Sequence, residues 1–514
     1  MRKLIAILTT LALLFCLTGC SFSKRGNNQP TALVGETTHT INYHLSDLEV
    51  TLEEYTNEYW SMPVARQDDG SFVNEGHVLL GYSFSEDGSG ELIRPGYRFT
   101  LPNEDTEHNL YCVWAPETNP ADFETISSVG SVTITAYKGN DKIVYIPREI
   151  DGKTVTSIGE NAFANNKSLK EVHLTSGIQN VAPKAFADCE NLKTVTLYDN
   201  LKSIDDASFK GCSVKTVRVC AGKAPRYTNN FETYGIKYER IVNTMGEKRI
   251  IVLAGSSALY GIDTKYMESL FENDYTVVNY GTNANQSIIF YLDAIAPYLT
   301  KNDVLVFSPE QYGPFAYYTN GNPEMPSITL QGISTSYNLF ENIDVRNYTN
   351  VFNAISEYCN LSDRMKELSW YDHSPRLDTL GDNATLTSKM NTPDYICGNN
   401  GSFRFDETVI PEEFIPNLNR VINKINNTDA TILFSYPPHN VNNIEETSKN
   451  EYAYGFYNEW IAKTVDCPLI SDVRNYIYNG EYFDNTDYHL NTVGRELHTK
   501  QLAEDIKKAK VGIK

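Results

Sequence analysis

Ser157-Ile158-Gly159-Glu160-Asn161-Ala162-Phe163 is the stretch that decides the fold of the middle of this chain, because its pattern returns at a constant interval. A phenylalanine recurs every 23 residues, and so does the branched residue five positions before it. These repeated positions are Phe163, Phe186 and Phe209, with Ile158, Val181 and Ile204. A period of about 20 to 50 residues is typical of stacked repeat proteins.

Each repeat also contains a short run that is typical of a β-strand. The runs are Val172-His173-Leu174, Val195-Thr196-Leu197 and Val217-Arg218-Val219. Because one unit cannot bury its apolar side alone, neighbouring units must stack into a solenoid. With only about three units the array is short, so we expect the flanking segments to cover its ends.

Two of these units, Ser157 to Phe163 and Ala185-Phe186-Ala187-Asp188-Cys189, resemble the BspA-type leucine-rich repeat of bacterial surface antigens. The resemblance implies a leucine-rich-repeat domain, which we place at residues 124–240. Cys189 and Cys212 share one repeat position, where Asn166 stands in the preceding unit. We expect them to be small buried side chains in successive repeats, with a disulfide as the alternative.

The segment before the repeats has short alternating runs broken by glycine and aspartate, which predict a small β domain at residues 38–118. Three of its runs resemble the internalin B-type repeat, a β-grasp-like module of surface proteins. They are Gly81-Tyr82-Ser83, Arg94-Pro95-Gly96-Tyr97 and Leu110-Tyr111-Cys112-Val113-Trp114. This resemblance implies a spacer or an adhesive unit.

The N-terminus has the pattern of a secretory signal peptide at residues 1–20. Met1-Arg2-Lys3 carries two positive charges before the apolar run Leu4 to Leu17, which is too short to span roughly 30 Å of hydrocarbon with flanks. Leu17-Thr18-Gly19-Cys20 resembles a lipobox, which implies a bacterial lipoprotein whose acylated Cys20 anchors it to the membrane. The alternative is an ordinary signal peptide with an accidental cysteine. Residues 21–37 are expected to be a flexible tether.

The composition excludes two classes of partner. The chain has 44 lysines and arginines against 65 aspartates and glutamates, a formal charge of −21, so we expect no nucleic acid to bind. Its nine cysteines form no Cys-x-x-Cys pair, so we predict no structural metal and no dense disulfide framework. No second membrane span is expected, and the mature chain is predicted to be extracytoplasmic.

From residue 247 to residue 514, strand-like and helix-like segments alternate. The expected strands are Ile250–Leu253, Tyr275–Asn279, Asp303–Phe307 and Thr431–Phe434, and the expected helices are Lys265–Asn273, Ile288–Leu299 and Phe414–Ile425. Strands that are apolar on both faces, separated by helices, predict a three-layer, flavodoxin-like α/β domain with a parallel sheet. Ligands bind such sheets at the carboxyl ends of the strands.

Two segments of this domain carry residues suited to catalysis. The first strand ends in Gly255-Ser256-Ser257-Ala258-Leu259-Tyr260-Gly261, and a late segment reads Phe483-Asp484-Asn485-Thr486-Asp487-Tyr488-His489-Leu490-Asn491. An early serine and a late Asp/His block resemble the SGNH or GDSL-like hydrolases. Because Gly255 and Gly261 keep the glycine spacing of that family's first block, the resemblance implies Ser257 as the nucleophile and His489 as its base. Whether Ser256 replaces Ser257 stays open.

The family's other catalytic groups are only partly matched. An aspartate normally stands three residues before the histidine to fix its tautomer, but this chain has Thr486 there. Asp484 and Asp487 flank that position, and we favour Asp484 without excluding Asp487. Tyr280-Gly281-Thr282-Asn283 resembles the second block, which implies that the N–H groups of Ser257 and Gly281, together with Asn283, bind the oxyanion.

The third block lacks its usual amide, because the chain reads Ser308-Pro309-Glu310-Gln311-Tyr312 at that point. Losing one oxyanion donor typically costs about 10² to 10³ in rate. Asn283, Asn285 and Gln311 are the candidates to replace it. Divergent relatives resembling D-alanyl transfer proteins and alginate acetylation proteins also lack some blocks.

Each of these residues has a structural alternative. The two serines suit the cap of a following helix, and His489 could be a structural histidine. We expect His439 to be a loop residue rather than part of the cleft, and Glu310 to be a salt-bridged surface acid rather than a base.

The leading hypothesis is a surface-anchored esterase or O-acyltransferase that acts on acyl groups of cell-wall or exopolysaccharide glycans and needs no cofactor. The rival hypothesis is a non-catalytic adhesin or scaffold that binds glycan or a host protein through its repeats.

Overall fold

The computed structural model describes most of the chain after residue 38. The described residues are 39–45, 48–52, 62–102, 105–223, 233–282, 286–310, 325, 327–333, 336–360, 377–378, 380, 382–397, 403–410 and 413–509. Met1–Thr37 is one unit and Thr38–Lys514 is a second, compact unit. The predicted signal peptide, Cys20 and the tether therefore lie outside the described residues. None of the described helices has the length and apolar character required to cross a bilayer.

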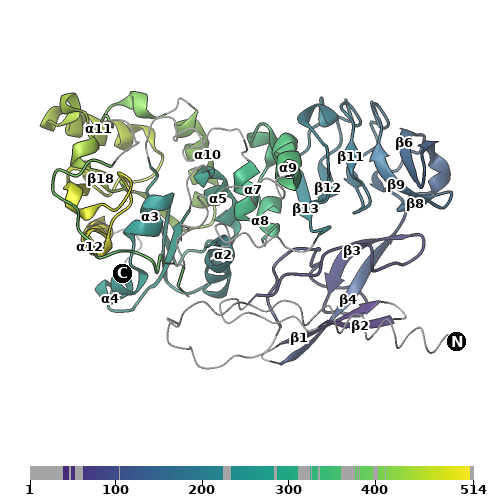
Figure 1. The fold of residues 1–514 in the computed structure, drawn as a ribbon, viewed down its shortest axis with the longest axis horizontal. Helices are drawn as coiled ribbons and strands as arrows, with labels where there is room; N and C mark the ends of the chain where they lie inside the picture. The colour runs from purple at the N-terminus through teal and green to yellow at the C-terminus, as the bar shows by residue number, and fades with distance from the viewer. Residues whose placement is uncertain are drawn as a thin grey trace. The chain divides into compact units, whose positions relative to one another are not determined.

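The first part of the compact unit is a four-stranded mixed sheet (Figure 1). Its strands are β1 (Thr40–Leu45), β2 (Leu48–Leu52), β3 (His77–Ser83) and β4 (Glu107–Pro116), in the order β2-β1-β4-β3. β1 and β4 are parallel and the other pairs are antiparallel. Tyr43 and Tyr82 pack edge to face at 4.8 Å and form its core with Leu110. The small β fold is thus as the alternating runs predicted.

The middle of the chain is a solenoid with two sheets, β13-β12-β10-β7 and β11-β9-β6-β5. The strands are β5 (Phe123–Ser127), β6 (Ser131–Tyr137), β7 (Ile143–Tyr145), β8 (Glu149–Ile150), β9 (Lys153–Ile158), β10 (Glu171–His173), β11 (Asn180–Val181), β12 (Thr194–Tyr198) and β13 (Thr216–Cys220). In the first sheet Val172 pairs with Val195 and Val195 with Val217, in parallel. Equivalent positions of successive units are therefore neighbours, as the period predicted.

A column of stacked rings forms the axis of the solenoid. Phe163 and Phe186 lie 4.8 Å apart and Phe186 and Phe209 lie 5.1 Å apart, with the last two planes within 2°. Tyr137 of β6 stacks on Phe163 at one end, and Phe352 of helix α9 (Val351–Asn360) stacks on Phe209 at the other, at 4.1 Å. The segment after the repeats thus covers one end of the column, as expected, whereas the ring at the other end belongs to the solenoid's own strand β6.

Cys189 and Cys212 lie beside this column as unbridged thiols. The Cys189 thiol donates to the carbonyl of Phe163, and the Cys212 thiol donates to the carbonyl of Phe186, each at 3.0 Å. The same contact in successive repeats agrees with the preferred interpretation, in which the two cysteines are small packed side chains. They do not form the disulfide that was the alternative.

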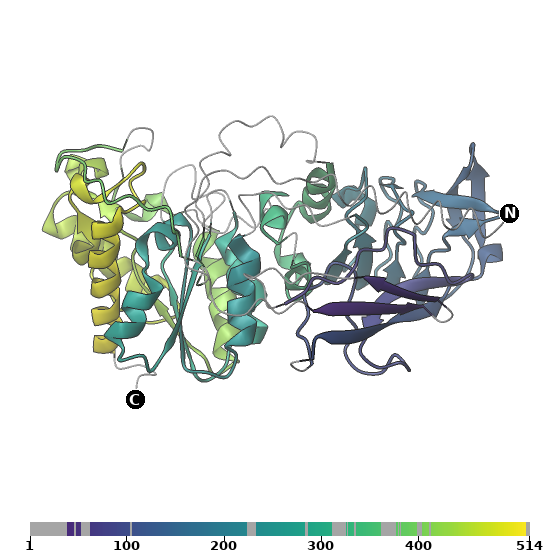
Figure 2. The ribbon, with the colours of Figure 1, turned by 60° about the horizontal axis from the view of Figure 1, so that its bottom comes forward.

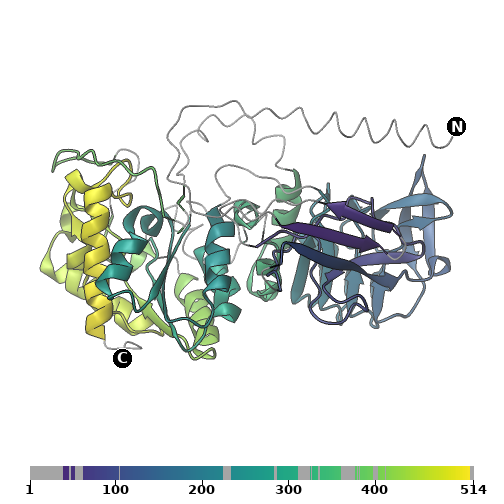
Figure 3. The same cartoon turned by 90° about the horizontal axis from the view of Figure 1, so that it is seen from below.

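The last part of the chain contains a parallel sheet with strand order β15-β14-β16-β17. Its strands are β14 (Arg249–Ala254), β15 (Thr276–Gly281), β16 (Asp303–Phe307) and β17 (Thr431–Phe434). Nearly every residue of these strands is buried, because helices cover both faces of the sheet (Figures 2 and 3). The predicted parallel α/β sheet is confirmed.

Two groups of helices make up the outer layers. The short helices α3 (Ser256–Gly261) and α4 (Thr264–Leu270) contact the long C-terminal helix α12 (Thr492–Ala509). Helix α5 (Ile288–Ile295) packs on α10 (Phe414–Asn426). Besides α9, the longer helices in the described part of the chain include α2 (Thr233–Asn243) and α11 (Glu451–Thr464).

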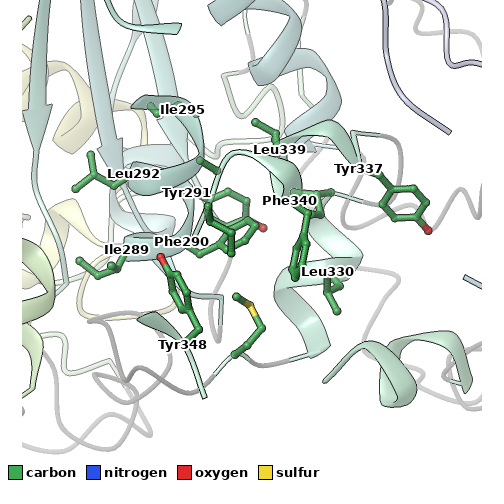
Figure 4. Close-up of a cluster of buried hydrophobic side chains, with 14 of the residues drawn as sticks. Ile289, Phe290, Tyr291, Leu292, Ile295, Leu330, Tyr337, Leu339, Phe340 and Tyr348 are labelled. Atoms are coloured by element: carbon green, nitrogen blue, oxygen red, sulfur yellow. The ribbon is translucent and has the colours of Figure 1, made fainter. Parts of the chain in front are cut away.

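Helix α5 is shorter than predicted. It ends at Ile295, and a 3-10 turn at Ala296–Tyr298 follows, because Pro297 has no N–H to continue the helix. All eight residues of α5 are buried, and Phe290 packs on Phe340 of the short helix α8 (Asn338–Glu341) at 5.9 Å. Figure 4 shows this cluster, to which Tyr348 and Leu330 also belong. Helix α5 in turn contacts β14 of the parallel sheet.

Candidate active site

Ser256 stands where the first strand of the parallel sheet turns into a helix. β14 ends at Ala254, Gly255 precedes the helix, and Ser256 is the first residue of α3. Its hydroxyl oxygen lies 2.8 Å from Nε2 of His489, which is 233 positions later in the chain. The carboxyl end of β14 and the segment before α12 thus meet at this contact.

The other nitrogen of His489 contacts an amide. Nδ1 lies 2.7 Å from Oδ1 of Asn485. An amide oxygen can only accept a hydrogen bond, so this pairing requires the proton on Nδ1 and leaves Nε2 as an acceptor. Ser256 then donates its hydroxyl proton toward Nε2, which is the orientation that base catalysis needs.

A tight turn brings Asn485 to the imidazole. The hydroxyl of Thr486 accepts hydrogen bonds from the N–H groups of Tyr488 and His489, at 3.2 and 3.0 Å. The N–H of Asp484 donates to the carbonyl of His489 at 2.8 Å and closes the loop. The chain therefore folds back on itself, and the residue four positions before the histidine reaches its ring.

Tyr260 covers one face of the same imidazole. Its ring lies parallel to that of His489, with centroids 3.8 Å apart and planes 3° apart. Tyr260 comes one helical turn after Ser256 on α3, so both side chains lie on one face of that helix. Burial raises the pKa of the Tyr260 phenol, and the nearby Asp484 carboxylate adds to this effect.

The surroundings of the His489 imidazole favour its neutral form. Burial disfavours the charged imidazolium and lowers the pKa of His489 well below its usual value. Asn485 adds no negative charge that would oppose this shift. His489 can therefore accept a proton but receives no ion-pair stabilisation from its orienting partner.

The structure corrects the prediction that Ser257 faces the histidine. Ser257 is 1% exposed, and its N–H donates to Oε1 of Glu310 at 2.5 Å. Successive side chains of a helix point about 100° apart, so only one of two adjacent serines can face His489. The glycine spacing of Gly255 and Gly261 did not reveal which one.

The prediction that Asp484 or Asp487 orients His489 also needs correction. The side chain at Nδ1 is that of Asn485, and Asp484 contributes its backbone to the turn instead. Asp487 is 3% exposed. The hydrogen bonds of Thr486 shorten the turn, which sequence spacing alone does not show.

The two backbone donors predicted for an oxyanion are both engaged. The N–H of Gly281 donates to Oδ1 of Asn279 at 3.0 Å, and that of Ser257 is held by Glu310. Gly281 is required for another reason, because a Cβ there would lie 2.3 Å from the N of Leu259 on α3. Asn283, Asn285 and Gln311 lie outside the described residues.

Glu310 is a buried residue and not the surface acid that the sequence suggested. It is 5% exposed, and its Oε2 accepts a second hydrogen bond from the N–H of Gly255 at 2.8 Å. Within the described residues, no lysine or arginine pairs with it. Burial raises the pKa of its carboxyl group, while hydrogen bonds from Ser257 and Gly255 act in the opposite direction.

His439, predicted as a loop residue, is buried in the short strand β18 (His439–Asn440), which pairs with β19 (Ile477–Tyr478). It packs on Phe403 at 4.6 Å, and burial lowers the pKa of its imidazole to about 3. Over the part of the chain that the structure describes, no group of three His, Cys, Asp or Glu side chains is arranged to hold a metal ion.

Comparison with known proteins identifies one segment. Residues 120–235 match the family described as the BspA type leucine rich repeat region, in six copies. This segment is therefore a BspA-type leucine-rich-repeat region, as the resemblance of its units implied, although the 23-residue period revealed fewer units than the six copies matched. No curated protein matches the chain.

Three of the solved structures that match parts of the chain are leucine-rich-repeat proteins. The leucine rich repeat protein of T. pallidum is 22% identical over 26% of this chain and 60% of its own, with a TM-score of 0.18. A leucine-rich repeat protein from Bacteroides ovatus is 22% identical over 20% of this chain and 36% of its own, with a TM-score of 0.15. A leucine rich cell surface protein from Faecalibacterium prausnitzii is 15% identical over 39% of this chain and 45% of its own, with a TM-score of 0.16. The chain thus spans less than two thirds of each of these proteins.

Proposed function

We propose that residues 247–514 form an SGNH-like serine esterase or O-acyltransferase in which Ser256 is the nucleophile and His489 is the general base. The observation that carries this proposal is the 2.8 Å contact between the Ser256 hydroxyl and Nε2 of His489. A serine hydroxyl becomes a useful nucleophile only when a base within about 2.6 to 3.2 Å takes its proton.

The reaction runs in two steps. His489 takes the hydroxyl proton as Ser256 Oγ attacks an ester carbonyl, and it returns that proton to the departing alcohol oxygen, which leaves an acyl-serine. A water molecule or a second hydroxyl then attacks the acyl-serine, with His489 again as the base, and Ser256 is restored. Asn485 holds Nδ1 protonated throughout. No cofactor takes part in these steps.

The oxyanion of this reaction needs a donor near Ser256. The N–H groups of the two neighbouring residues, Gly255 and Ser257, donate to the Glu310 carboxylate. The N–H of Ser256 does not donate to this carboxylate, and we assign it as the backbone donor to the oxyanion. In hydrolases of this kind the nucleophile's own N–H points at the oxyanion, which supports the assignment.

The proposed substrate follows from the rest of the chain. The signal pattern and Cys20 support a lipoprotein on the outer side of a bacterial membrane, and the BspA-type repeats support a place at the cell surface. Acyl groups on cell-wall or exopolysaccharide glycans are the esters within reach there. The repeats would bind glycan or a protein next to the substrate. A β-grasp-like, internalin B-type module at residues 38–118 belongs to the same proposal.

A second function, a non-catalytic adhesin or scaffold, is favoured by one observation. The N–H groups of Ser257 and Gly281, which the family resemblance assigned to the oxyanion, are both engaged within the protein. A site without those donors loses much of its stabilisation of the transition state.

Labelling with a fluorophosphonate probe tests the two functions, because the probe reacts only with an activated serine. We expect the full-length protein to be labelled and Ser256→Ala to lose all labelling. Ser257→Ala should still be labelled, since its side chain does not face His489. Failure of the unmodified protein to react, or labelling that survives in Ser256→Ala, would reject the esterase and leave the adhesin.

A further inference from the structure

The two oxygens of Glu310 hold the backbone on either side of Ser256. Oε2 accepts from the N–H of Gly255 at 2.8 Å, and Oε1 accepts from the N–H of Ser257 at 2.5 Å. Glu310 follows strand β16, and the serine follows strand β14, its neighbour in the sheet. One side chain thus bridges the ends of two adjacent strands at the proposed nucleophile.

Helix α3 depends on this bridge for its first turn. Its N-cap is Gly255, which has no side chain and therefore offers no capping hydrogen bond of its own. The first N–H groups of a helix have no partner within the helix, and a carboxylate suits them in both geometry and charge. Glu310 supplies this cap from the loop that follows β16.

Glu310 also explains why position 255 is a glycine. A Cβ at Gly255 would lie 2.2 Å from Oε2 and 2.6 Å from the carboxyl carbon of Glu310. The carboxylate therefore presses directly against the turn. No side chain fits between Glu310 and the backbone that carries Ser256.

We propose that Glu310 is a positioning residue that fixes the turn of Ser256 so that its hydroxyl points at His489. This inference rests on the proposed esterase or acyltransferase function. Glu310 occupies the third block, where the family resemblance implied an oxyanion donor. In this chain the position supplies an acceptor for the nucleophile's own turn instead.

The burial of Glu310 supports this assignment. A carboxylate that is 5% exposed and has no cationic partner among the described residues is costly to keep unless it is well hydrogen-bonded. Hydrogen bonds from Gly255 and Ser257 supply that compensation. The titratable group on the other side of the turn of Ser256 is His489. Its Nε2 contacts the turn at the Ser256 hydroxyl.

Labelling kinetics of two full-length variants test the proposal. In Glu310→Gln the side chain keeps its length but has one acceptor oxygen, and in Glu310→Asp it keeps its charge but is one methylene shorter. We expect the maximal rate constant of fluorophosphonate labelling to fall about 10²-fold in each, with the half-saturating probe concentration unchanged. Circular dichroism and thermal unfolding identify which variants are folded.

Asp199→Asn is a matched control in the solenoid. Asp199 is also a buried carboxylate, 5% exposed, and it accepts from the N–H of Gly222 at 2.8 Å. We expect Asp199→Asn to lower stability but to leave the labelling rate constant unchanged. A folded Glu310→Gln or Glu310→Asp protein with the unmodified rate constant would overturn the inference while the esterase stands. An unmodified protein that does not react would overturn the esterase itself.

Discussion

The phenol ring of Tyr260 lies flat against the imidazole of His489, with ring centroids 3.8 Å apart. Ser256 contacts the same imidazole at Nε2, from one turn earlier on helix α3. One six-residue helix thus supplies both the group that reacts with the base and the surface that holds the base in place.

Tyr260→Ala is expected to slow labelling about tenfold. An aromatic pair contributes about 0.5–1.5 kcal/mol beyond its buried area, and about 1.4 kcal/mol corresponds to a factor of ten. Tyr260→Phe keeps the ring and should label at nearly the unmodified rate. Equal rates for the alanine and the unmodified protein would show that the stacking does not hold His489.

Asn485→Asp is expected to raise the pKa of His489, because a carboxylate at Nδ1 stabilises the imidazolium. Hydrolysis requires neutral His489, so the rate rises with pH through this pKa. In the unmodified protein burial lowers the pKa of His489, so the rate should already be independent of pH near neutrality.

The pH profile of p-nitrophenyl acetate hydrolysis should shift upward by about one pH unit or more in Asn485→Asp. Asn485→Ala, which has no acceptor at Nδ1, should be slower at every pH, and an unshifted profile in Asn485→Asp would exclude a role for this position.

Glu310 makes the stability of the protein depend on pH. Burial raises the pKa of its carboxyl group above the ordinary 4.5, so the folded state binds its proton more tightly than the unfolded state. The resulting stabilisation is complete below the ordinary value and is lost as pH rises through the folded pKa. Glu310→Gln cannot titrate, so its Tm relative to the unmodified protein should increase between about pH 4 and pH 7. A constant difference across that range would contradict the raised pKa.

Phe186→Ala is expected to lower the free energy of unfolding by about 3–5 kcal/mol, the usual loss for a fully buried phenylalanine. Phe186 is 0% exposed and stacks between Phe163 and Phe209. Urea denaturation measures the change. Val129→Ala in the same solenoid is the control, since Val129 is 100% exposed and the substitution should change the stability by less than about 0.5 kcal/mol. A loss below about 1 kcal/mol at Phe186 would mean that the column contributes little.

Features with a period or a continuous apolar run could be predicted from the sequence. The strands at Asp303–Phe307 and Thr431–Phe434 have the bounds that were predicted, because every residue of the first and most of the second must be buried between helices. The 23-residue repeat likewise left only stacking as a way to bury its phenylalanines.

The details of the site depended on distances that spacing does not encode. Whether Ser256 or Ser257 faces His489 depends on the rotation of α3 about its axis, which Glu310 fixes from the loop after β16. Asn485 reaches the imidazole only because Thr486 bonds two N–H groups in the turn between them. Glu310 is buried without a cation among the described residues, a state that its charge alone argues against.

The ring of Phe352, which lies outside the repeats and closes one end of the phenylalanine column, constrains how this protein can evolve. Gene duplications commonly lengthen repeat arrays, but an extra unit added after Phe209 would displace this ring. A new unit that enters earlier in the array would bring its own phenylalanine into line and leave the contact between Phe209 and Phe352 intact.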